Sequence, residues 1–342
     1  MSQVYFSDYA NYSYLHYERA DVEDEIIPLI RPLLEFRWAQ GKGVKWGDKF
    51  GESAQLSWSI GTSTSTYTDW HYSWDTPINE RFGNDPTQEE IDSISKIFEH
   101  WSKFANVNFT YVEDDSNSKG NIRVIFIDMG SATGIAYLAP DGEFHINNNL
   151  RDDLTNSSNR FAEHIVSHEI GHAVFGLNDV SLIHGWDEPN GDNGKLLPWH
   201  LNNHKWTVMS YMDVGNIHGI SPMVLDILAI QKIYGSNNST GEGDTIYRWD
   251  ESPFETIWDV SGNDTIDLSN FNDDINFQTE DGNLIEIGDK NVVGIAFNVD
   301  IENFIGGNGN DYFYLSEKVI SVNSNGGDDL IFAENDISNV II

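Results

Sequence analysis

The chain has 342 residues and a formal net charge of −36, with 55 Asp and Glu against 19 Lys and Arg. So acidic a chain is a poor partner for nucleic acid, which needs a basic face, and no stretch approaches the roughly 18 apolar residues of a membrane-spanning helix. The lack of cysteine excludes disulfides, thiolate zinc sites and cysteine nucleophiles, while the length predicts about two domains.

The first 40 residues begin polar and rich in tyrosine. A basic stretch followed by an apolar run is missing there, so we predict no cleavable signal peptide. Residues 21–38 predict a helix that the prolines at positions 28 and 32 bend or break. We interpret residues 1–40 as an N-terminal extension that could be a pro-segment, a tether or a lid.

Strand and helix patterns alternate over the next hundred residues. Apolar and polar residues alternate over 54–60, which predicts a strand, and Thr87 to Glu90 resemble a capping box that starts a helix reaching Phe104. Strands are predicted at 107–112 and 121–126, followed by a hinged pair at 134–140 and 142–147. An extended peptide could pair with a free edge near 142–147.

Residues 165–179 contain the pattern H-E-x-x-H, formed by His168, Glu169 and His172. Histidines four apart on a helix leave the same face and can share one tetrahedral metal ion. In this pattern they bind Zn²⁺, and the glutamate takes a proton from a metal-bound water. The stretch therefore predicts a zinc-binding helix.

A long loop is predicted at 180–205, where Gly, Asn, Asp and His are frequent. His200 and His204 in this loop could bind metal, but solvated loop histidines are the simpler interpretation. A helix is predicted from Ser221 to Tyr234, with Pro222 in its first turn and Gly235 at its end.

The acidic tail after Gly235 carries an internal repeat. Residues 306–313 fit G-G-x-G-x-D-x-U, and residues 324–331 repeat it with weaker glycines, so that Asp311 and Asp329 are 18 residues apart. Glycine carbonyls and aspartate carboxylates of stacked turns can hold Ca²⁺. The repeat predicts a parallel β-roll.

The order of helix, Met-Ser-Tyr turn and acidic repeats resembles the serralysin family of secreted bacterial zinc metalloproteases. The likeness runs from about Thr87 to Asp311 and is weaker beyond. It is densest at 167–173, 208–211, 226–235, 243–245, 258–259, 262–265, 301–303 and 305–307. It implies an α+β metzincin catalytic domain at 41–235, a mixed twisted sheet with a long zinc-binding helix. An all-β parallel β-roll domain is implied at 236–342.

The resemblance also implies roles for single residues. His168 and His172 would bind zinc, Glu169 would be the general base, and Met209 would lie in the turn beneath the metal. Tyr211 would bind zinc at rest and stabilise the oxyanion during catalysis, although a buried structural tyrosine is an equal alternative. A first calcium site would use Gly241, Gly243, Thr245, Asp259 and Asp264; a second would use Gly262, Asp264, Asp300 and Glu302; and further sites would use Asp311 and Asp329.

The chain departs from the family at the third zinc ligand. The family reads H-E-x-x-H-x-x-G-x-x-H, but here Phe175 is an extra residue before Gly176 and the last histidine is missing. Counting without a gap gives Asn178, a poor zinc ligand, whereas counting from the glycine gives Asp179. We favour Asp179, with His184 as the alternative.

These features predict a monomeric, secreted zinc endopeptidase that cleaves extended polypeptides and carries several structural Ca²⁺ ions. The aliphatic end of the chain resembles a type I secretion signal, although an apolar last strand would explain it equally. A proteinaceous inhibitor could be a partner, and residues 1–40 could inhibit the domain until removed. The competing hypothesis is a protease-derived extracellular binding protein, stabilised by calcium and catalytically weak or inactive.

Overall fold

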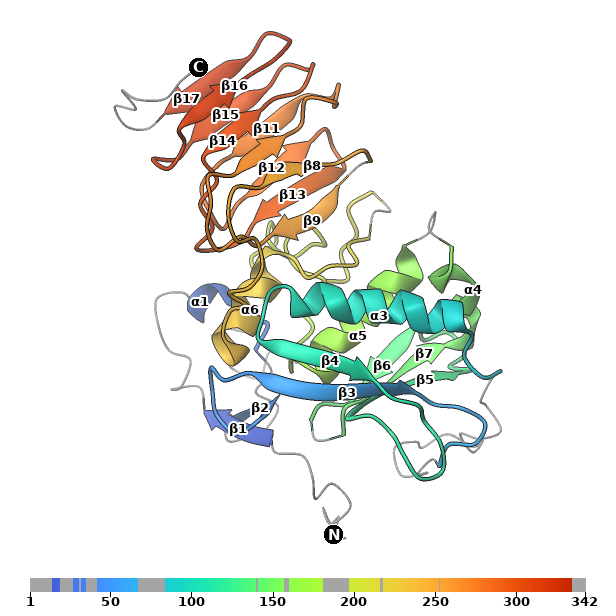
Figure 1. Ribbon diagram of the computed structural model, residues 1–342. Helices are drawn as coiled ribbons and strands as arrows, with labels where there is room; N and C mark the ends of the chain where they lie inside the picture. The colour runs from blue at the N-terminus through green and yellow to red at the C-terminus, as the bar shows by residue number, and fades with distance from the viewer. Residues whose placement is uncertain are drawn as a thin grey trace.

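A computed structural model describes residues 14–18, 27–30, 32–34, 42–66, 84–139, 141–156, 160–180, 197–215, 218–251 and 253–333. Figure 1 shows an α/β part, drawn in blue to yellow, and a second part of stacked strands, drawn in orange to red. We call residues 246–333 the two-sheet unit. The helix α6 (Val224–Tyr234) lies where the two parts meet.

A five-stranded sheet is the base of the α/β part. Its order is β4 (Val107–Tyr111), β3 (Ala54–Ile60), β5 (Ile122–Ile127), β7 (Glu143–Asn147) and β6 (Gly134–Ala136). Neighbouring strands are parallel except β6, which runs antiparallel to β7. The predicted strands are therefore confirmed, but the expectation of a free edge at 142–147 is wrong. Because β6 pairs with β7, the edge strands are β4 and β6, and β6 is the one that packs against α5.

Two long helices pack on one face of this sheet (Figure 1). The helix α3 (Gln88–Ser102) begins at the predicted capping box, in which the Glu90 N–H donates to Thr87 Oγ1 at 3.3 Å and the Thr87 N–H donates to Glu90 Oε2 at 2.7 Å. The helix α5 (Phe161–Ala173) packs against α3, β6 and β7 and carries the H-E-x-x-H pattern. Short helical turns η4 (Asn148–Leu150) and α4 (Arg151–Leu154) precede it.

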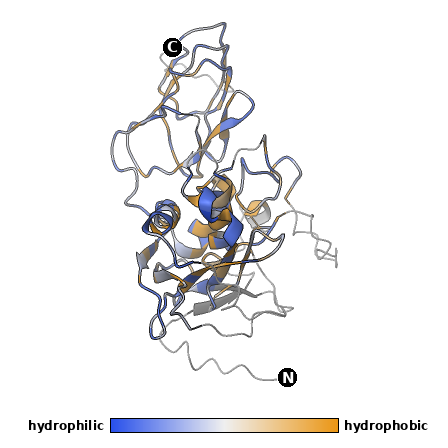
Figure 2. Ribbon diagram, turned by 90° about the vertical axis from the view of Figure 1, so that its right-hand side faces the viewer, coloured by the Kyte–Doolittle hydropathy of each residue, from blue (hydrophilic) through white to orange (hydrophobic). Residues whose placement is uncertain are grey.

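The apolar core explains why these elements pack as they do. Apolar residues gather where the helices contact the sheet (Figure 2). Ile94, Phe98 and Trp101 of α3 are buried there, as the apolar face of this helix predicts. Within the described residues, none of the helices combines the length and the apolar character needed to cross a membrane.

The N-terminal segment contributes to the same core. The strand β1 (Tyr14–Glu18) pairs antiparallel with β2 (Lys42–Trp46), and neither was predicted. Within the predicted helix 21–38, the described residues form only α1 (Ile27–Ile30) and a turn, while 21–26, 31 and 35–38 lie outside the described residues. Ile30, Leu33 and Leu34 are buried, so part of the segment interpreted as an extension packs as core.

The helix α6 begins at Val224, three residues later than predicted, and ends as predicted at Gly235, whose φ is 77°. At its other end, Asp226 accepts a hydrogen bond from the Met223 N–H at 2.9 Å, which caps the first turn. In the last turn of α6, the Tyr234 hydroxyl donates a hydrogen bond to the Val174 carbonyl at 2.8 Å, which connects the end of α6 to the end of α5.

The two-sheet unit consists of two stacked sheets. The first, in spatial order, is β16 (Ser321–Asn323), β14 (Asn303–Ile305), β10 (Thr265–Asp267) and β8 (Ile246–Arg248), all parallel. The second is β17 (Leu330–Ala333), β15 (Tyr312–Leu315), β11 (Ile275–Gln278), β12 (Leu284–Ile287), β13 (Asn291–Ile295) and β9 (Phe254–Ile257).

The strand register agrees with the repeat read from the sequence. Asn303 pairs with Ser321 and Tyr312 pairs with Leu330, each 18 residues on. The prediction that all strands of this unit run parallel is wrong for β12, which is antiparallel to both β11 and β13. This extra strand enlarges one coil of the unit.

Candidate metal centre

The two histidines of the H-E-x-x-H pattern converge on one point beside α5. Their Nε2 atoms are 3.1 Å apart. The Nδ1 atom of His168 lies 2.9 Å from the Val208 carbonyl oxygen, and that of His172 lies 2.7 Å from the Leu177 carbonyl oxygen. Because a carbonyl only accepts, each Nδ1 carries the hydrogen and each Nε2 is left as a lone pair. Both rings therefore offer ligand atoms to a common metal.

The end of α5 explains how the extra residue Phe175 is accommodated. Its ring is buried and stacks on Trp101 with 4.6 Å between ring centroids. The chain then turns at Gly176, whose φ of 63° favours glycine. The Leu177 N–H donates to the Gly171 carbonyl at 2.9 Å, six residues back, so the closing turn is one residue wider than a Schellman turn.

This wide turn places Asp179 next to His168 and His172. Its Oδ1 atom lies 3.1 Å from Nε2 of His168 and 3.2 Å from Nε2 of His172. Tetrahedral ligands at about 2.0–2.1 Å from zinc would be roughly 3.3 Å apart. Oδ1 is also buried, and no described residue donates a hydrogen bond to it in good geometry. The three atoms fit a zinc ion, while the alternative ligand His184 lies outside the described residues.

The two carboxylates at the centre, those of Asp179 and Glu169, have pKa values shifted in opposite directions. Burial raises the pKa of Asp179, but the two neighbouring imidazoles outweigh this effect and hold the pKa well below its usual range. Burial raises the pKa of Glu169 to about 7, opposed by His168 and assisted by Asp179. Asp179 is thus held ionised, as a metal ligand must be, whereas Glu169 can gain or lose a proton near neutral pH.

The edge strand β6 confines Glu169. A Cβ atom added to Gly134 would lie 2.3 Å from Oε1 of Glu169 and 2.9 Å from its Cδ, so only glycine leaves room for the carboxylate. No pattern in the sequence indicates this contact, because Gly134 fits an ordinary strand pattern. The contact places the edge of the sheet directly beside Glu169.

The Met-Ser-Tyr turn lies beneath α5, as the resemblance implied. Met209 is buried, and its Sδ would be 2.5 Å from a Cβ added to Gly171. Asp226 fixes this turn: its carboxylate accepts hydrogen bonds from the Thr207 hydroxyl at 2.5 Å and from the Val208 N–H at 2.8 Å. This role of Asp226 was missed, although an acid in the first turn of a buried helix is a usable signal.

Tyr211 follows the turn and reaches the centre. Its ring stacks on that of His168, with 5.5 Å between centroids and an interplanar angle of 29°. The side chain is half-buried. The ring therefore lies beside one of the two histidines, as the role implied by the resemblance requires.

The residues predicted for the first calcium site lie together where the chain enters the two-sheet unit. A Cβ added to Gly241 would be 2.7 Å from the carboxylate of Asp259. One added to Gly262 would be 2.5 Å from Oδ1 of Asp264 and 2.7 Å from the Gly243 carbonyl oxygen. The Thr245 N–H donates to Oδ1 of Asp264 at 2.8 Å. Carbonyls and carboxylates therefore face one another as a calcium site requires.

The remaining predicted calcium ligands fit to different degrees. Glu302 accepts from the Asp264 N–H at 2.7 Å, and Asp329 accepts from the Asp311 N–H at 2.9 Å, so these carboxylates link neighbouring coils. Asp300 is half exposed and pairs with Nζ of Lys318 at 2.9 Å. A lysine in this position competes with a cation, which weakens the case for Asp300.

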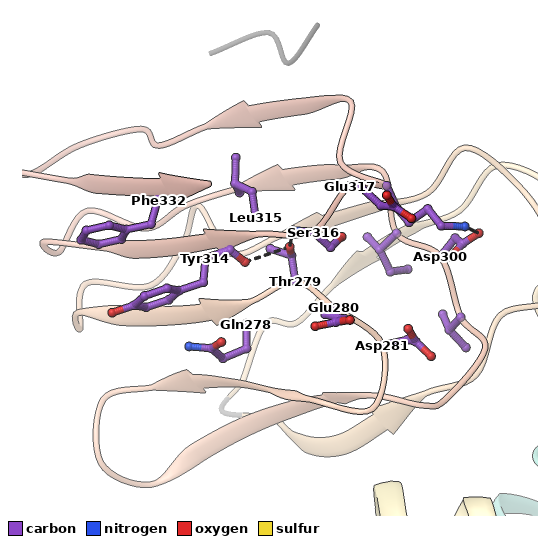
Figure 3. Close-up of a pocket in the computed structure, with 13 residues that line it drawn as sticks. Gln278, Thr279, Glu280, Asp281, Asp300, Tyr314, Leu315, Ser316, Glu317 and Phe332 are labelled. Atoms are coloured by element: carbon purple, nitrogen blue, oxygen red, sulfur yellow. Dashed lines mark hydrogen bonds and ion pairs between the residues drawn. The ribbon is translucent and has the colours of Figure 1, made fainter. Parts of the chain in front are cut away.

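A cleft in the two-sheet unit lies apart from the metal centre. Glu280, Asp281 and Glu317 line it, and Figure 3 shows the rings of Tyr314 and Phe332 side by side along neighbouring strands. These rings stack with 5.0 Å between centroids. None of the H-E-x-x-H residues borders the cleft, so it belongs to a different surface.

The two loop histidines differ in burial, and the prediction that both are solvated is wrong for His204. His200 is exposed, as expected for a solvated histidine, but His204 is buried with only 5% of its surface exposed. Its Nε2 atom lies 2.8 Å from the Ser210 carbonyl oxygen. His204 therefore packs beneath the loop and does not pair with His200.

Comparison with known proteins shows sequence similarity to serralysins. Residues 224–341 match the family described as Peptidase M10 serralysin C terminal. The chain is 29% identical over 308 residues to a serralysin of Photorhabdus sp. (strain Az29), covering 81% of this chain and 60% of the relative. It is 30% identical over 301 residues to a serralysin of Photorhabdus laumondii, covering 78% and 60%. Serralysin B of Dickeya chrysanthemi is 27% identical over 292 residues, covering 77% and 59%. The chain thus spans about three fifths of the length of these relatives.

Proposed function

The chain is serralysin-like, and from this premise we propose that it is a secreted zinc-dependent endopeptidase of the metzincin type. The observation that carries the proposal is the meeting of three ligand atoms within 3.1–3.2 Å of one another, with a buried glutamate next to them in sequence on α5. Two neutral imidazoles and a carboxylate, with one position left open, are a ligand set of catalytic zinc.

His168, His172 and Asp179 would hold the ion. When bound, Zn²⁺ would supply a Lewis acid that polarises the scissile carbonyl and acidifies a water. The carbonyls of Val208 and Leu177 hold the two rings in the tautomer that this requires. Met209 supports α5 from below, and Asp226 keeps that support in place.

Glu169 would act as the general base and then as the general acid. Its pKa of about 7, raised by burial, suits a group that takes a proton from water and returns it to the leaving amine. Gly134 leaves the carboxylate enough space and limits where it can move. Tyr211, stacked on His168, would donate its hydroxyl hydrogen to the developing oxyanion.

An extended polypeptide would lie along the edge strand β6, because residues 142–147 are paired on both sides. Backbone groups of an edge strand are available to pair with a peptide, and Gly134 on this strand contacts the catalytic glutamate. The peptide would therefore run past the metal centre with one carbonyl directed at it.

The two-sheet unit would be a β-roll that folds around Ca²⁺ outside the cell. Asp259, Asp264 and Asp311 are almost completely buried, and burial and then neighbouring carboxylates raise the pKa of Asp264 and Asp311, so bound cations would offset this repulsion. Calcium outside the cell is abundant enough to do this. We further propose type I secretion, a monomeric state and inhibition by a protein that occupies the β6 edge.

The test is Glu169→Gln, assayed by cleavage of an unfolded protein such as casein. We expect the rate to fall about 10²–10⁴-fold, because the amide cannot accept the proton, while zinc content stays unchanged. The matched control is Glu163→Gln on the same helix, which should keep full activity. Equal rates for Glu169→Gln and the parent would refute the mechanism. A parent chain that binds casein without cutting it would favour the binding protein.

A further inference from the structure

Three histidines from separate segments meet one turn along α5 from the metal centre. They are His164 on α5, His204 in the loop before Met209, and His218 shortly before α6. Ring centroids are 4.3 Å apart for His164 and His204, 5.5 Å for His164 and His218, and 5.7 Å for His204 and His218. One ring nitrogen of each lies within 4.8 Å of one nitrogen of the other two.

Hydrogen bonds to backbone carbonyls determine which ring nitrogens of this cluster carry the hydrogen. Nδ1 of His164 lies 2.8 Å from the Gly219 carbonyl oxygen, and Nε2 of His204 lies 2.8 Å from the Ser210 carbonyl oxygen. These nitrogens must carry hydrogen, because a carbonyl only accepts. In a neutral imidazole the opposite nitrogen is then a lone pair, which leaves Nε2 of His164 and Nδ1 of His204 as metal ligands.

Two ring nitrogens of the cluster lack hydrogen-bond partners among the described residues. Nδ1 of His204 and Nδ1 of His218 are buried, and no described residue forms a hydrogen bond with either. Leaving a buried acceptor without a donor costs free energy, which a bound metal ion would remove. Burial also lowers the pKa of all three histidines, most strongly for His164, so protonation does not relieve the cluster at neutral pH.

We propose that His164, His204 and His218 bind a second zinc ion, separate from the one at His168, His172 and Asp179. Imidazole ligands suit zinc and related transition metals, whereas Ca²⁺ and Mg²⁺ prefer oxygen. Nitrogens of a tetrahedral zinc site would be roughly 3.3 Å apart, so each ring has to move by about an ångström. His218 is half-buried and gives the ion access to solvent for its fourth position.

The position of the cluster indicates what this ion would do. It would join the start of α5, the loop that leads to Met209, and the segment before α6. His204 holds the Ser210 carbonyl with its other nitrogen, one residue before Tyr211. The second ion would therefore keep the Met-Ser-Tyr turn in place under the first one. This inference stands whether or not the chain cleaves peptides.

The test counts zinc per chain. The full chain carrying Glu169→Gln, which prevents self-cleavage, is loaded with Zn²⁺ in a calcium-containing buffer, separated from unbound metal and measured by mass spectrometry of the elements. We expect two zinc ions in this parent, one after adding His218→Gln, one after adding His168→Gln, and none with both changes. His200→Gln, at an exposed histidine of the same loop, should leave two.

A parent that binds one zinc and keeps it after His218→Gln would overturn the proposal. Loss of all zinc from the His168→Gln variant alone would overturn it as well. Circular dichroism checks that each variant is folded. If His218→Gln does not fold, a zinc-anomalous map of the parent decides: a peak between the three rings supports the site, and its absence refutes it.

Discussion

Gly134→Ala is a small change that should disturb catalysis without disturbing the fold. The added Cβ would lie 2.3 Å from Oε1 of Glu169, whereas unstrained contacts begin near 3.4 Å, so the carboxylate must move by 1.1 Å. Misplacing a catalytic group by about an ångström can cost roughly 10²-fold in rate. The backbone of Gly134 has an ordinary φ, and the atoms it meets belong to a side chain, so folding should be preserved.

The assay compares kcat/KM for an unfolded protein substrate with zinc content and thermal stability. We expect activity to fall about 100-fold, with the zinc content and the melting temperature retained. Gly326→Ala is the matched control, because the nearest atom to its added Cβ is 3.7 Å away. Full activity of Gly134→Ala would refute the close coupling of β6 to Glu169.

Three further predictions concern stability, each measured by urea unfolding. Asp226→Ala leaves the buried N–H groups of Val208 and Met223 without an acceptor and should lower the free energy of unfolding by about 2–6 kcal/mol. Asp226→Asn keeps one oxygen as an acceptor for both N–H groups, so it should cost clearly less. Equal losses of stability in the two variants would contradict this role of Asp226. Leu33→Ala should cost about 2–5 kcal/mol because Leu33 is fully buried; no loss would favour a removable pro-segment. Without calcium, burial and then neighbouring carboxylates raise the pKa of Asp311 from 3.8 to about 6. The folded state then binds more protons than the unfolded state, so relative to Asp311→Asn the chain should lose stability as pH rises from about 4 to 6. Calcium should reverse this trend, because it binds the ionised form, and a calcium-free chain that gains stability over that range would refute the argument.

Local patterns were enough to predict the elements that carry the centre. The i, i+4 spacing of His168 and His172 requires only a helix, and Gly176 marked where the chain turns back. Counting from that glycine predicted that Asp179 would reach the histidines, and the structure brings it there. The 18-residue spacing of Asp311 and Asp329 likewise predicted the register of the last strands.

The features that the sequence did not reveal depend on contacts between distant segments. The edge strand β6 is only three residues long, so the sequence did not show whether β6 or β7 forms the edge of the sheet. The antiparallel β12 interrupts the repeat with ordinary strand residues. His204 lies 40 residues from His164 in a polar loop, so the sequence does not show that the fold buries it beside α5.

A zinc-anomalous diffraction map of the full chain tests the central claim most directly. We predict a peak bonded to Nε2 of His168, Nε2 of His172 and Oδ1 of Asp179, at about 2.0–2.2 Å from each. A peak bonded to His184 in place of Asp179, or no peak beside Glu169, would contradict the account.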